Sequence, residues 1–354
     1  MELKKLRKRI DLLDKKLVDV ITERVKVALK ISDFKRNKNI HPYSPEREAE
    51  VLRRIRRLNP GIIDDEVFEF LFTQIMSITF SLSTPLKIAY LGPKATFTHL
   101  AAIKKFGEKV EFIPSSDITS LFSAVENTEV NFGVVPIENS TEGVVTHTLD
   151  MFMDSNLHIC SEVVLKITHH LLASTPISKV KKIYSHPHVF PQCRKWLARH
   201  MASAILIPVE TTAKAAEMVK RKKDSACIAS EACSRIYNLK ILARNIQDSS
   251  GNITRFLVIG KYITRPTGHD KTSILFSVKD RVGALHDMLV PFKKNRINLT
   301  KIESRPSKKK PWEYYFFVDF QGHHEDKKVK QALRELEKKC HFVNILGSYP
   351  KAMW

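Results

Sequence analysis

The stretch Asp248-Ser-Ser-Gly-Asn-Ile-Thr-Arg-Phe-Leu-Val-Ile259 joins a turn to a strand. Its first five residues favour tight backbone turns, and the apolar run 256–259 is typical of a buried strand. Thr254 and Arg255 lie between them, where a loop meets a rigid element, and ligand-binding groups are often held at such places. The stretch by itself is compatible with a plain strand that has a polar entry, or with part of a functional site.

The composition indicates a globular protein of two or three domains. The chain has 354 residues, of which 43% are hydrophobic and 27% charged, as in ordinary soluble proteins. No window approaches 18 uninterrupted apolar residues, so we expect no membrane span. The N-terminus is charged and has no apolar signal region, and the five cysteines are scattered without a Cys-x-x-Cys pair. These features predict a cytoplasmic protein with reduced thiols.

The net charge of +21 first suggests a nucleic-acid partner. The excess is however spread along the chain, with +5 in residues 1–84, +8 in 85–269 and +8 in 270–354. No recognition-helix pattern or aromatic stacking platform accompanies it, so we expect no nucleic acid, and the basic surface would attract a small polyanion. Three histidine pairs lack metal-ligand spacing, so no metal is expected; they are His169-His170, His186-Pro-His188 and His323-His324.

Residues 1–84 predict a domain of three helices. Neither Gly nor Pro interrupts residues 1–41, and apolar residues recur there every three or four positions. A helix of about 34 residues would be ~50 Å long, too long to be covered by its own small domain, so we expect a partner helix from a second chain. Ser44-Pro45 predicts the start of a second helix and Asn59-Pro60-Gly61 its end. A third helix should run from Asp64 or Asp65 to just before Pro85.

Beyond residue 85 the hydrophobic pattern changes to alternating strands and helices. Residues 85–265 predict an α/β domain, with strands at 87–91, 132–137, 159–172, 205–209, 227–229 and 256–259 and helices between them. After a linker at 266–270, residues 270–354 follow the order β-α-β-β-α-β of a ferredoxin-like fold. Its strands are expected at 272–278, 299–304, 312–320 and 342–348, and its helices at 284–295 and 327–340.

Several cations stand out against the apolar stripe of the first helix. Arg24 and Lys35 are eleven residues apart and therefore differ by only ~20° around the helix, on one face. Arg7 lies ~25 Å from Arg24 along the axis and ~100° round it, so one small ligand cannot touch both on a single helix. If these cations serve one site, Arg7 must come from a partner chain. The alternative is a solvated coiled-coil face.

Residues 1–84 resemble the all-helical chorismate mutase domain, an intertwined dimer. The resemblance rests on Leu6-Arg7-Lys8-Arg9-Ile10-Asp11, Glu23-Arg24, Lys35, Pro45-Glu-Arg-Glu-Ala-Glu-Val-Leu52 and Ile75-Met-Ser77. That family converts chorismate to prephenate by a pericyclic rearrangement, through restraint and charge stabilisation. The resemblance implies that Arg24 and the partner's Arg7 bind the two carboxylates and that Lys35 donates to the ether oxygen. It also implies that Glu48 holds the ring hydroxyl and that Arg47 supports the site.

One position departs from the mutase family. The family has Gln or Glu at the position of Ser83, where it makes a second contact to the ether oxygen, and serine is too short to do so. Losing one such donor typically lowers the rate ~10²–10³-fold. Thr79, one turn earlier, matches a position that is usually small. We therefore expect a weakened mutase, and an alternative is a dehydratase that keeps the helical domain for dimerisation only.

The middle domain resembles prephenate dehydratase from Leu86 to about Lys261. The matching motifs are Gly92-Pro-Lys-Ala-Thr-Phe-Thr98, Val135-Pro-Ile-Glu-Asn-Ser140, Ser185-His-Pro187 with Gln192, and Asn252-Ile-Thr-Arg-Phe256. Each follows or ends a predicted strand, so all could face a cleft between two lobes. The resemblance makes Thr254 the catalytic residue at the leaving hydroxyl. The residues expected to bind substrate are Thr96, Glu138, Asn139, Ser140, Ser185, His186, Gln192, Arg255 and Phe256.

The last domain resembles the ACT regulatory domain that accompanies such dehydratases. Gly283-Ala-Leu-His286 and Glu303-Ser-Arg-Pro306 carry the resemblance, which implies binding of phenylalanine by Gly283, Ala284, Leu285, His286, Glu303, Ser304, Arg305 and Pro306. Gly283 would allow close backbone approach at a helix start, whose free N–H groups suit a carboxylate. The alternative is a plain dimerisation module.

Together these features predict a homodimeric or homotetrameric enzyme with two activities. It would convert chorismate to prephenate and prephenate to phenylpyruvate, with feedback inhibition by phenylalanine and with no organic cofactor. A ligand-sensing or nucleic-acid-binding protein is the alternative from another class; it predicts salt-sensitive nucleic-acid binding and no turnover of prephenate.

Overall fold

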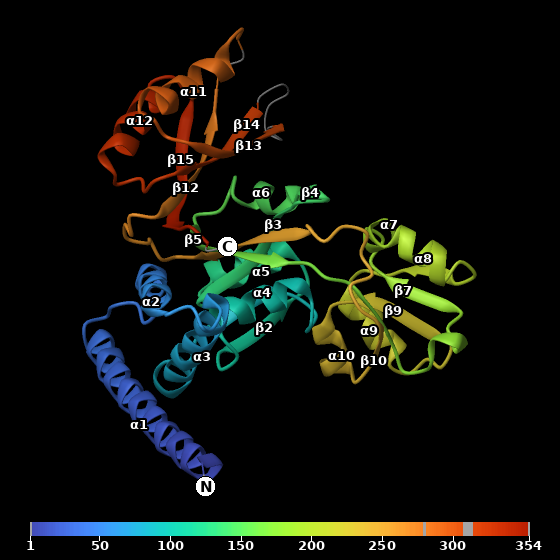
Figure 1. Ribbon diagram of the computed structural model, residues 1–354. Coiled ribbons are helices and arrows are strands. Elements are labelled where there is room, and N and C mark those ends of the chain that lie inside the picture. Colours follow the sequence, from blue (N-terminus) through green and yellow to red (C-terminus); the bar gives the residue numbers. More distant parts are fainter. Residues whose placement is uncertain (1, 279–280, 307–313, 353–354) are drawn as a thin grey trace. The chain divides into compact units, whose positions relative to one another are not determined.

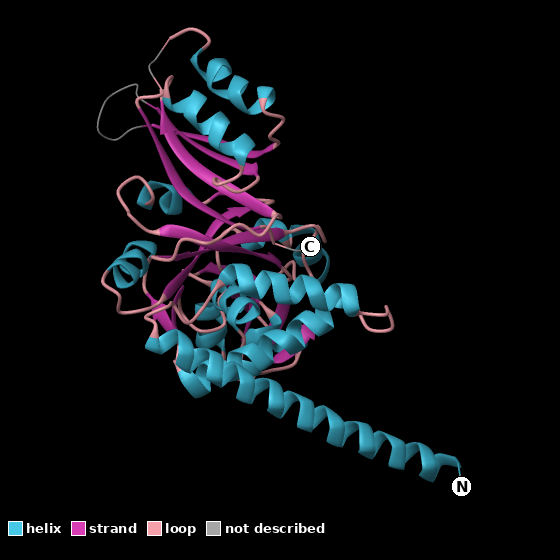
Figure 2. Cartoon of the chain, turned by 90° about the vertical axis from the view of Figure 1, so that its left-hand side faces the viewer, coloured by secondary structure: helices cyan, strands magenta, loops and turns pink. Residues whose placement is uncertain are grey.

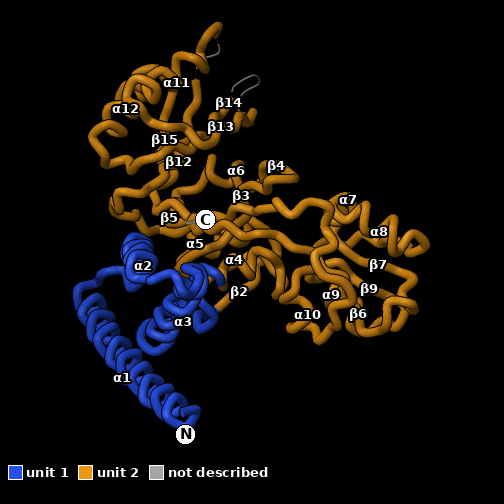
Figure 3. The backbone as a smooth tube through the Cα atoms, in the orientation of Figure 1, with its two compact units in different colours: residues 1–87, 104–111 blue, residues 88–103, 112–354 orange. Residues whose placement is uncertain are grey.

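A computed structural model describes residues 2–278, 281–306 and 314–352 (Figure 1). The chain divides into two compact units, one of residues 1–87 and 104–111, the other of residues 88–103 and 112–354 (Figure 3). Among the helices of the described residues, none combines the length and apolar character needed to cross a bilayer.

The first unit contains the three predicted helices, α1 (Glu2–Asn37), α2 (Pro45–Leu58) and α3 (Asp65–Ser83). Helix α2 begins as expected, because the Ser44 side chain accepts a hydrogen bond from the Arg47 N–H at 3.4 Å and Pro45 occupies the first turn. Helix α1 is a single long rod (Figure 2) with no fully buried residue. Its apolar stripe is exposed in this chain, with Leu6 56%, Ile10 57% and Leu17 59% exposed.

The second unit begins with a lobe built on a sheet in the order β2-β1-β3-β11-β5, with β4 paired to β3. Strands β1 and β3 are parallel, whereas β11 is antiparallel to both β3 and β5. The strands are β1 (Lys87–Leu91), β2 (Glu111–Ser115), β3 (Phe132–Asn139), β4 (Gly143–Val144), β5 (His158–Lys166) and β11 (Ile253–Gly260). The helices are α4 (Phe97–Phe106), α5 (Ile118–Glu126) and α6 (Thr146–Met151).

A second lobe is built on the sheet β10-β6-β9-β7-β8. Its strands are β6 (His170–Ala173), β7 (Lys182–Ser185), β8 (Ile205–Pro208), β9 (Ser225–Ala229) and β10 (Lys240–Ala243). Its helices are η1 (Ile177–Lys179), α7 (Val189–Gln192), α8 (Arg194–His200), α9 (Thr212–Val219) and α10 (Glu231–Tyr237). The prediction of one strand at 159–172 is wrong, because the run divides into β5 and β6, which belong to different sheets. A continuous apolar run does not reveal where a chain leaves one sheet for another.

Two chain segments connect the lobes, and hydrogen bonds link them. The Ile167 N–H donates to Asn252 O at 2.8 Å, and the Ile246 N–H donates to His169 O at 2.9 Å. The first segment is residues 167–169 and the second is residues 244–252, which includes the turn of the opening motif. That turn therefore lies between the lobes.

The C-terminal part confirms the ferredoxin-like prediction. Its antiparallel sheet has the order β13-β14-β12-β15, and two helices cover one face (Figure 2). The elements are β12 (Asp270–Ser277), α11 (Ala284–Lys294), β13 (Leu299–Pro306), β14 (Tyr314–Gln321), α12 (Lys327–Glu337) and β15 (Phe342–Pro350). Residues 312 and 313 of the predicted third strand lie outside the described residues.

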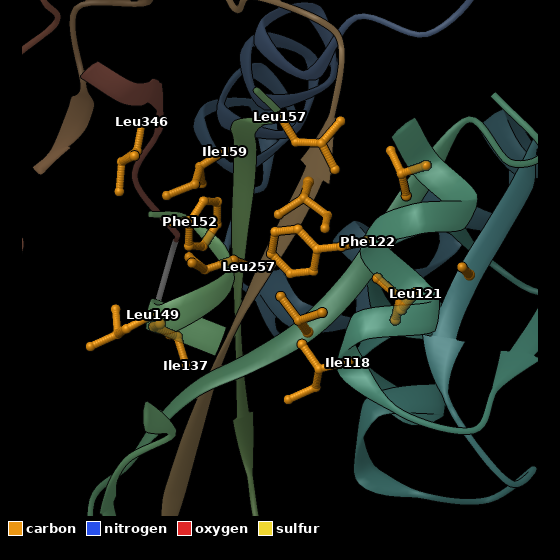
Figure 4. Packing of buried hydrophobic residues seen from close by; sticks show 14 of the residues in the cluster. Ile118, Leu121, Phe122, Ile137, Leu149, Phe152, Leu157, Ile159, Leu257 and Leu346 are labelled. Atoms are coloured by element: carbon orange, nitrogen blue, oxygen red, sulfur yellow. The ribbon is translucent and has the colours of Figure 1, made fainter. Parts of the chain in front are cut away.

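The other face of this sheet packs on the first lobe in one hydrophobic core. Leu275, Phe317 and Leu346 belong to the same buried cluster as Phe152 and Ile159, and Figure 4 shows Leu346 beside Ile159. Burial of apolar area between the sheet and the lobe contributes about 25 cal/mol per Å² to the stability of the folded chain. The C-terminal sheet is therefore joined to β5 and β11 through a continuous apolar layer.

Candidate active sites

The helical unit encloses a cavity of about 570 Å³ that is rich in cations. Of the predicted site residues, Arg24, Lys35, Arg47, Glu48, Thr79 and Ser83 all line it, together with Arg54 and Lys105. Arg7 is exposed on α1 and does not line the cavity in the single chain. Its contribution from a partner chain stays a prediction.

Arg24 is prepared to bind an anion. Burial lowers the pKa of Arg24, and the nearby guanidinium groups of Arg54 and Arg47 lower it further. Its Nη1 atom is buried and, among the described residues, has no hydrogen-bond partner. A buried N–H without an acceptor costs about 1–3 kcal/mol, which a bound carboxylate would recover. Three neighbouring arginines suit a ligand with more than one negative charge.

Lys35 on α1 and Glu48 on α2 both line the cavity and are held by hydrogen bonds. Lys35 Nζ donates to Pro42 O at 2.9 Å, and burial lowers the pKa of Lys35 although Glu46 opposes this effect. Glu48 is only 7% exposed. Its Oε2 atom accepts a hydrogen bond from Tyr43 Oη and an ion pair from Lys105 Nζ at 2.8 Å. The cavity therefore contains one buried carboxylate among several cations.

The hydroxyls on α3 donate to the helix itself. Ser83 Oγ donates to Thr79 O at 2.9 Å, and Thr79 Oγ1 donates to Ile75 O at 3.1 Å. Each hydroxyl has one hydrogen, so neither donates into the cavity in this conformation. The departure at Ser83 thus leaves this wall with no side-chain donor of the length that Gln or Glu would supply.

Between the two lobes, Asn139 orients the hydroxyl of Thr254. The two residues are paired across β3 and β11, and Asn139 Nδ2 donates to Thr254 Oγ1 at 2.7 Å. Asn139 Oδ1 accepts the backbone N–H groups of Thr141 and Glu142 at 2.8 and 2.9 Å, which fixes the amide orientation. Because Thr254 Oγ1 accepts from Asn139, its own hydrogen remains available to a ligand.

A chain of side-chain hydrogen bonds continues from Asn139 to residues of the second lobe. Asn139 Nδ2 also donates to Asn252 Oδ1 at 2.7 Å, and Asn252 Nδ2 donates to Gln192 Oε1 at 2.9 Å. Gln192 Nε2 then donates to Glu142 Oε1 at 2.7 Å, and Glu142 Oε2 contacts His188. Every amide in the chain has one possible orientation, because one end is set by backbone N–H groups and the other by a carboxylate.

His169 completes this network from the segment between the lobes. Its Nε2 lies 3.0 Å from Gln192 Oε1, an acceptor, so Nε2 carries the hydrogen. Burial lowers the pKa of His169 to about 4, and its ring meets Phe97 edge to face at 5.7 Å between centroids. His169 is therefore neutral near pH 7 and acts as a donor to the network.

Arg255 and Glu138 form ion pairs with each other and with neighbouring charged groups, and their predicted contact with substrate stays a prediction. Side chains alternate along a strand, so Arg255 and Glu138, which are also paired across β11 and β3, point away from Thr254 and Asn139. Arg255 contacts Glu138 Oε1 at 3.0 Å, Glu162 Oε2 at 2.7 Å and Asp319 Oδ2 at 2.6 Å. These partners lie at the junction with the C-terminal sheet.

The pKa values at this junction reflect its ion pairs. Burial alone would lower the pKa of Arg255, but Tyr349 and three carboxylates raise it overall. Burial alone would raise the pKa of Glu138 and of Glu162, yet the neighbouring cations lower both. Lys301 pairs with Glu138 and Lys271 Nζ lies 2.7 Å from Glu162 Oε2. Arg255, Glu138 and Glu162 are therefore charged at pH 7.

Four other predicted residues have structural contacts. Ser140 joins β3 to the turn of the opening motif, since its Oγ donates to Gly251 O at 3.1 Å and accepts from the Ile253 N–H at 2.9 Å. Ser185 Oγ donates to Ile228 O at 2.8 Å, and Thr96 Oγ1 donates to Leu91 O at 2.8 Å. Phe256 is 1% exposed. These contacts occupy the hydroxyl hydrogens of all three polar residues.

His186 lies beside the hydrogen-bond network that contains Glu142, and its contact with substrate stays a prediction. Its ring lies 5.1 Å from that of His188, which contacts Glu142. Burial and the neighbouring His188 lower the pKa of His186, whereas Glu142 raises it. His186 is therefore mainly neutral at pH 7.

The two motifs of the C-terminal domain occupy different elements. Gly283 adopts φ +78 immediately before α11, a conformation that favours glycine, and a Cβ there would meet nothing within 4 Å. Leu285 and His286 follow on the exposed start of α11. On the edge strand β13, Arg305 pairs with Asp150 at 3.2 Å, while Ser304 and Pro306 are exposed. Both motifs thus present open backbone or side chains to a ligand or partner.

Six polar residues of these sites were not predicted from the sequence as site residues. Glu142 and Asn252 lie within or beside quoted motifs, and His169 and His188 were considered only as metal ligands; the remaining two are Arg54 and Lys105. Because side chains alternate along a strand, the sequence could have shown that Thr254 and Arg255 lie on opposite faces of the sheet.

Three families match successive segments of the chain. Residues 6–84 match chorismate mutase type II, residues 88–263 match prephenate dehydratase and residues 272–338 match the ACT domain. A bifunctional chorismate mutase/prephenate dehydratase of Aquifex aeolicus (strain VF5) is 50% identical over 357 residues, which cover 99% of each chain. One of the same description from Pseudomonas aeruginosa is 46% identical over 99% of this chain and 98% of that protein.

A solved structure is similar over three quarters of the chain. It is a prephenate dehydratase from Arthrobacter aurescens in complex with L-Phe, with a TM-score of 0.71 and 32% identity. The match covers 75% of this chain and 90% of that one.

Proposed function

The chain belongs to the family of bifunctional chorismate mutase/prephenate dehydratases, and from this membership we propose how its residues carry the two reactions. The protein converts chorismate to prephenate and prephenate to phenylpyruvate, in the biosynthesis of phenylalanine, which regulates it through the ACT domain. The three domains are proposed to span residues 1–84, 85–265 and 270–354.

The cavity of the helical unit is the proposed mutase site. Chorismate carries two carboxylates, and the unpartnered Nη1 of Arg24 beside Arg47 and Arg54 supports binding of one of them there. Lys35 is proposed to donate to the ether oxygen, which gains negative charge in the transition state, and Glu48 to accept from the ring hydroxyl. Arg7 of a partner chain would bind the second carboxylate. The exposed apolar stripe of α1 supports such a dimer.

Thr254 is the proposed hydrogen-bond donor to the hydroxyl that leaves prephenate. As the bond from the ring to the carboxylate breaks, its electron pair enters the ring, carbon dioxide departs and the hydroxyl leaves as water after gaining one proton. The orientation of Asn139 carries the proposal, because it directs the hydrogen of Thr254 toward a ligand. A threonine hydroxyl is a weak acid, so Thr254 relays this proton, which comes finally from solvent.

Replacement of Thr254 tests this role. Thr254→Ala should lower kcat for prephenate about 10²–10³-fold, since one transition-state donor is lost. Thr254→Ser is the matched control, because it keeps the hydroxyl and should retain most of the activity. Turnover of chorismate by the same preparation should be unchanged. Undiminished prephenate turnover by Thr254→Ala would overturn the assignment.

Phenylalanine is proposed to bind at the Gly283–His286 and Glu303–Pro306 motifs of paired ACT domains. The open approach to Gly283 and the exposed edge of β13 support this placement. Light scattering should then give the mass of a dimer or tetramer, and Gly283→Val should weaken inhibition without lowering turnover. A cytoplasmic location is proposed as well, supported by the five cysteines, which are free thiols.

A further inference from the structure

One side chain in the mutase cavity comes from a helix that lies outside the mutase sequence. Lys105, in the last turn of α4, places its Nζ 2.8 Å from Glu48 Oε2, and the two side chains are only 13% and 7% exposed. Residue 105 falls within the segment that matches prephenate dehydratase. Residues 104–111 nevertheless belong to the compact unit of the helical domain (Figure 3).

Several contacts seat this segment on α3. The Lys109 N–H donates to Ser77 Oγ at 2.8 Å, and the Glu108 N–H donates to Gln74 Oε1 at 3.0 Å. Gly107 has φ +74, and a Cβ added there would lie 2.5 Å from Ser77 Cβ, so the approach requires glycine. Backbone contacts therefore fix the segment that carries Lys105, so the position of this side chain in the cavity is determined by the fold.

Lys105 neutralises the only carboxylate among the cavity residues that is buried. A buried carboxylate stays ionised when an opposite charge and hydrogen-bond donors compensate for lost water. Tyr43 Oη and Lys105 Nζ both contact Oε2 of Glu48. Among the described residues, no hydrogen bond or ion pair to Oε1 of Glu48 is present. That oxygen can therefore accept a hydrogen bond from a ligand.

We propose that Lys105 is a positioning residue of the mutase site, which holds Glu48 ionised and presents its Oε1 to the ring hydroxyl of chorismate. This inference rests on the proposed role of Glu48. It means that the rearrangement depends on a residue that the dehydratase segment supplies. A mutase domain defined by residues 1–84 alone would lack this residue.

Removal of Lys105 should change the pH dependence of the mutase reaction. Without the ammonium group, the buried carboxylate of Glu48 would lose the counter-charge that Lys105 supplies at 2.8 Å, and burial disfavours an unpaired carboxylate. The other charged groups that line the cavity are Glu23, Arg24 and Lys35 on α1 and Arg47 and Arg54 on α2, and α3 contributes none. These charged groups all remain in the variant. A change in chorismate turnover on the acid side of the pH profile therefore reports on the pair of Lys105 and Glu48.

The experiment uses the full chain and both of its activities. Lys105→Met keeps the apolar stem and should lower kcat/KM for chorismate about ten- to hundredfold at pH 7, the effect of one lost hydrogen bond to a charged group. Activity should recover as pH rises, and Lys105→Gln should behave likewise. Lys105→Arg should restore most of the activity. Lys104→Ala, an exposed neighbour on α4, is the matched control and should change nothing.

A double variant separates the possible failures. In a Glu48→Gln background, Lys105→Met should have no further effect on chorismate turnover or its pH profile. If Glu48→Gln impairs the mutase but Lys105→Met does not, or if Lys105→Met lowers the rate equally in both backgrounds, the inference is wrong and the role of Glu48 stands. If Glu48→Gln leaves turnover unchanged, both are wrong. Prephenate turnover, unchanged throughout, shows that each variant is folded.

Discussion

Replacement of Arg255 should loosen the junction between β11 and the ACT sheet. The guanidinium group donates to Glu162, Glu138 and Asp319 at 2.7, 3.0 and 2.6 Å and to Tyr349 Oη at 2.8 Å. In Arg255→Met, Glu162 keeps Lys271 and Glu138 keeps Lys301. Asp319 keeps only the hydroxyl of Ser273, because among the described residues Arg255 is its only cationic partner.

One buried carboxylate is thus left without a counter-charge, which typically destabilises a protein by about 3–5 kcal/mol. With a urea slope near ~3 kcal/mol/M, the midpoint of unfolding should fall by roughly 1–2 M. The two activities serve as local probes. Prephenate turnover should be lost at this lower urea concentration. Chorismate turnover should fall there only to the level of Lys105→Met, because α4 unfolds with its lobe while α1, α2 and α3 remain folded.

Two further variants make the test specific. Arg244→Met removes an exposed pair with Glu231 at 3.1 Å, and such surface pairs contribute only ~0–1 kcal/mol. In the double variant Arg255→Met with Asp319→Leu, part of the lost stability should return, because no uncompensated charge remains. A midpoint shift for Arg255→Met no larger than that for Arg244→Met would refute the reasoning, and so would a double variant less stable than Arg255→Met.

Three other predictions concern single positions or pH. Ser83→Gln should raise kcat for chorismate by up to about a hundredfold, because a longer side chain can donate into the cavity. If a stopped assay gives the same chorismate turnover for Ser83→Gln and the wild type, the short serine does not limit the rate. Asn139→Asp should lower kcat for prephenate about 10²–10³-fold with chorismate turnover intact, because a carboxylate would accept the hydrogen that Thr254 now offers to substrate; wild-type kcat would contradict the proposed orientation. The pKa values of Glu138 and Glu162 lie below their ordinary value of 4.5, so the stability that they contribute is present above that pH and is lost as pH falls through the lowered values. The urea midpoint for prephenate turnover should accordingly drop between about pH 5 and 3 and should drop less in Arg255→Met, whereas identical slopes would argue against these ion pairs.

Local patterns along the chain were sufficient for most of the fold. The 3.6-residue period of α1, the Ser44-Pro45 start of α2 and the β-α-β-β-α-β order of the tail each depend on neighbours within a few residues. Asn139 likewise ends β3 and Thr254 lies at the start of β11, and the apolar runs of both strands are visible in the sequence. These features could be predicted because propensity, capping and periodicity act over short separations.

Other features depended on distances between remote segments. Whether Arg255 faces substrate or the ACT sheet is a question of which side of β11 meets which layer, and the division of residues 159–172 between two sheets is of the same kind. Lys105 reaches Glu48 only because Gly107 lets the end of α4 approach Ser77 closely. Such contacts join residues tens or hundreds of positions apart, and no local preference encodes them. The chain's own patterns thus specified the elements and the family of motifs, while packing decided which charged groups meet and therefore which of them serve the reactions.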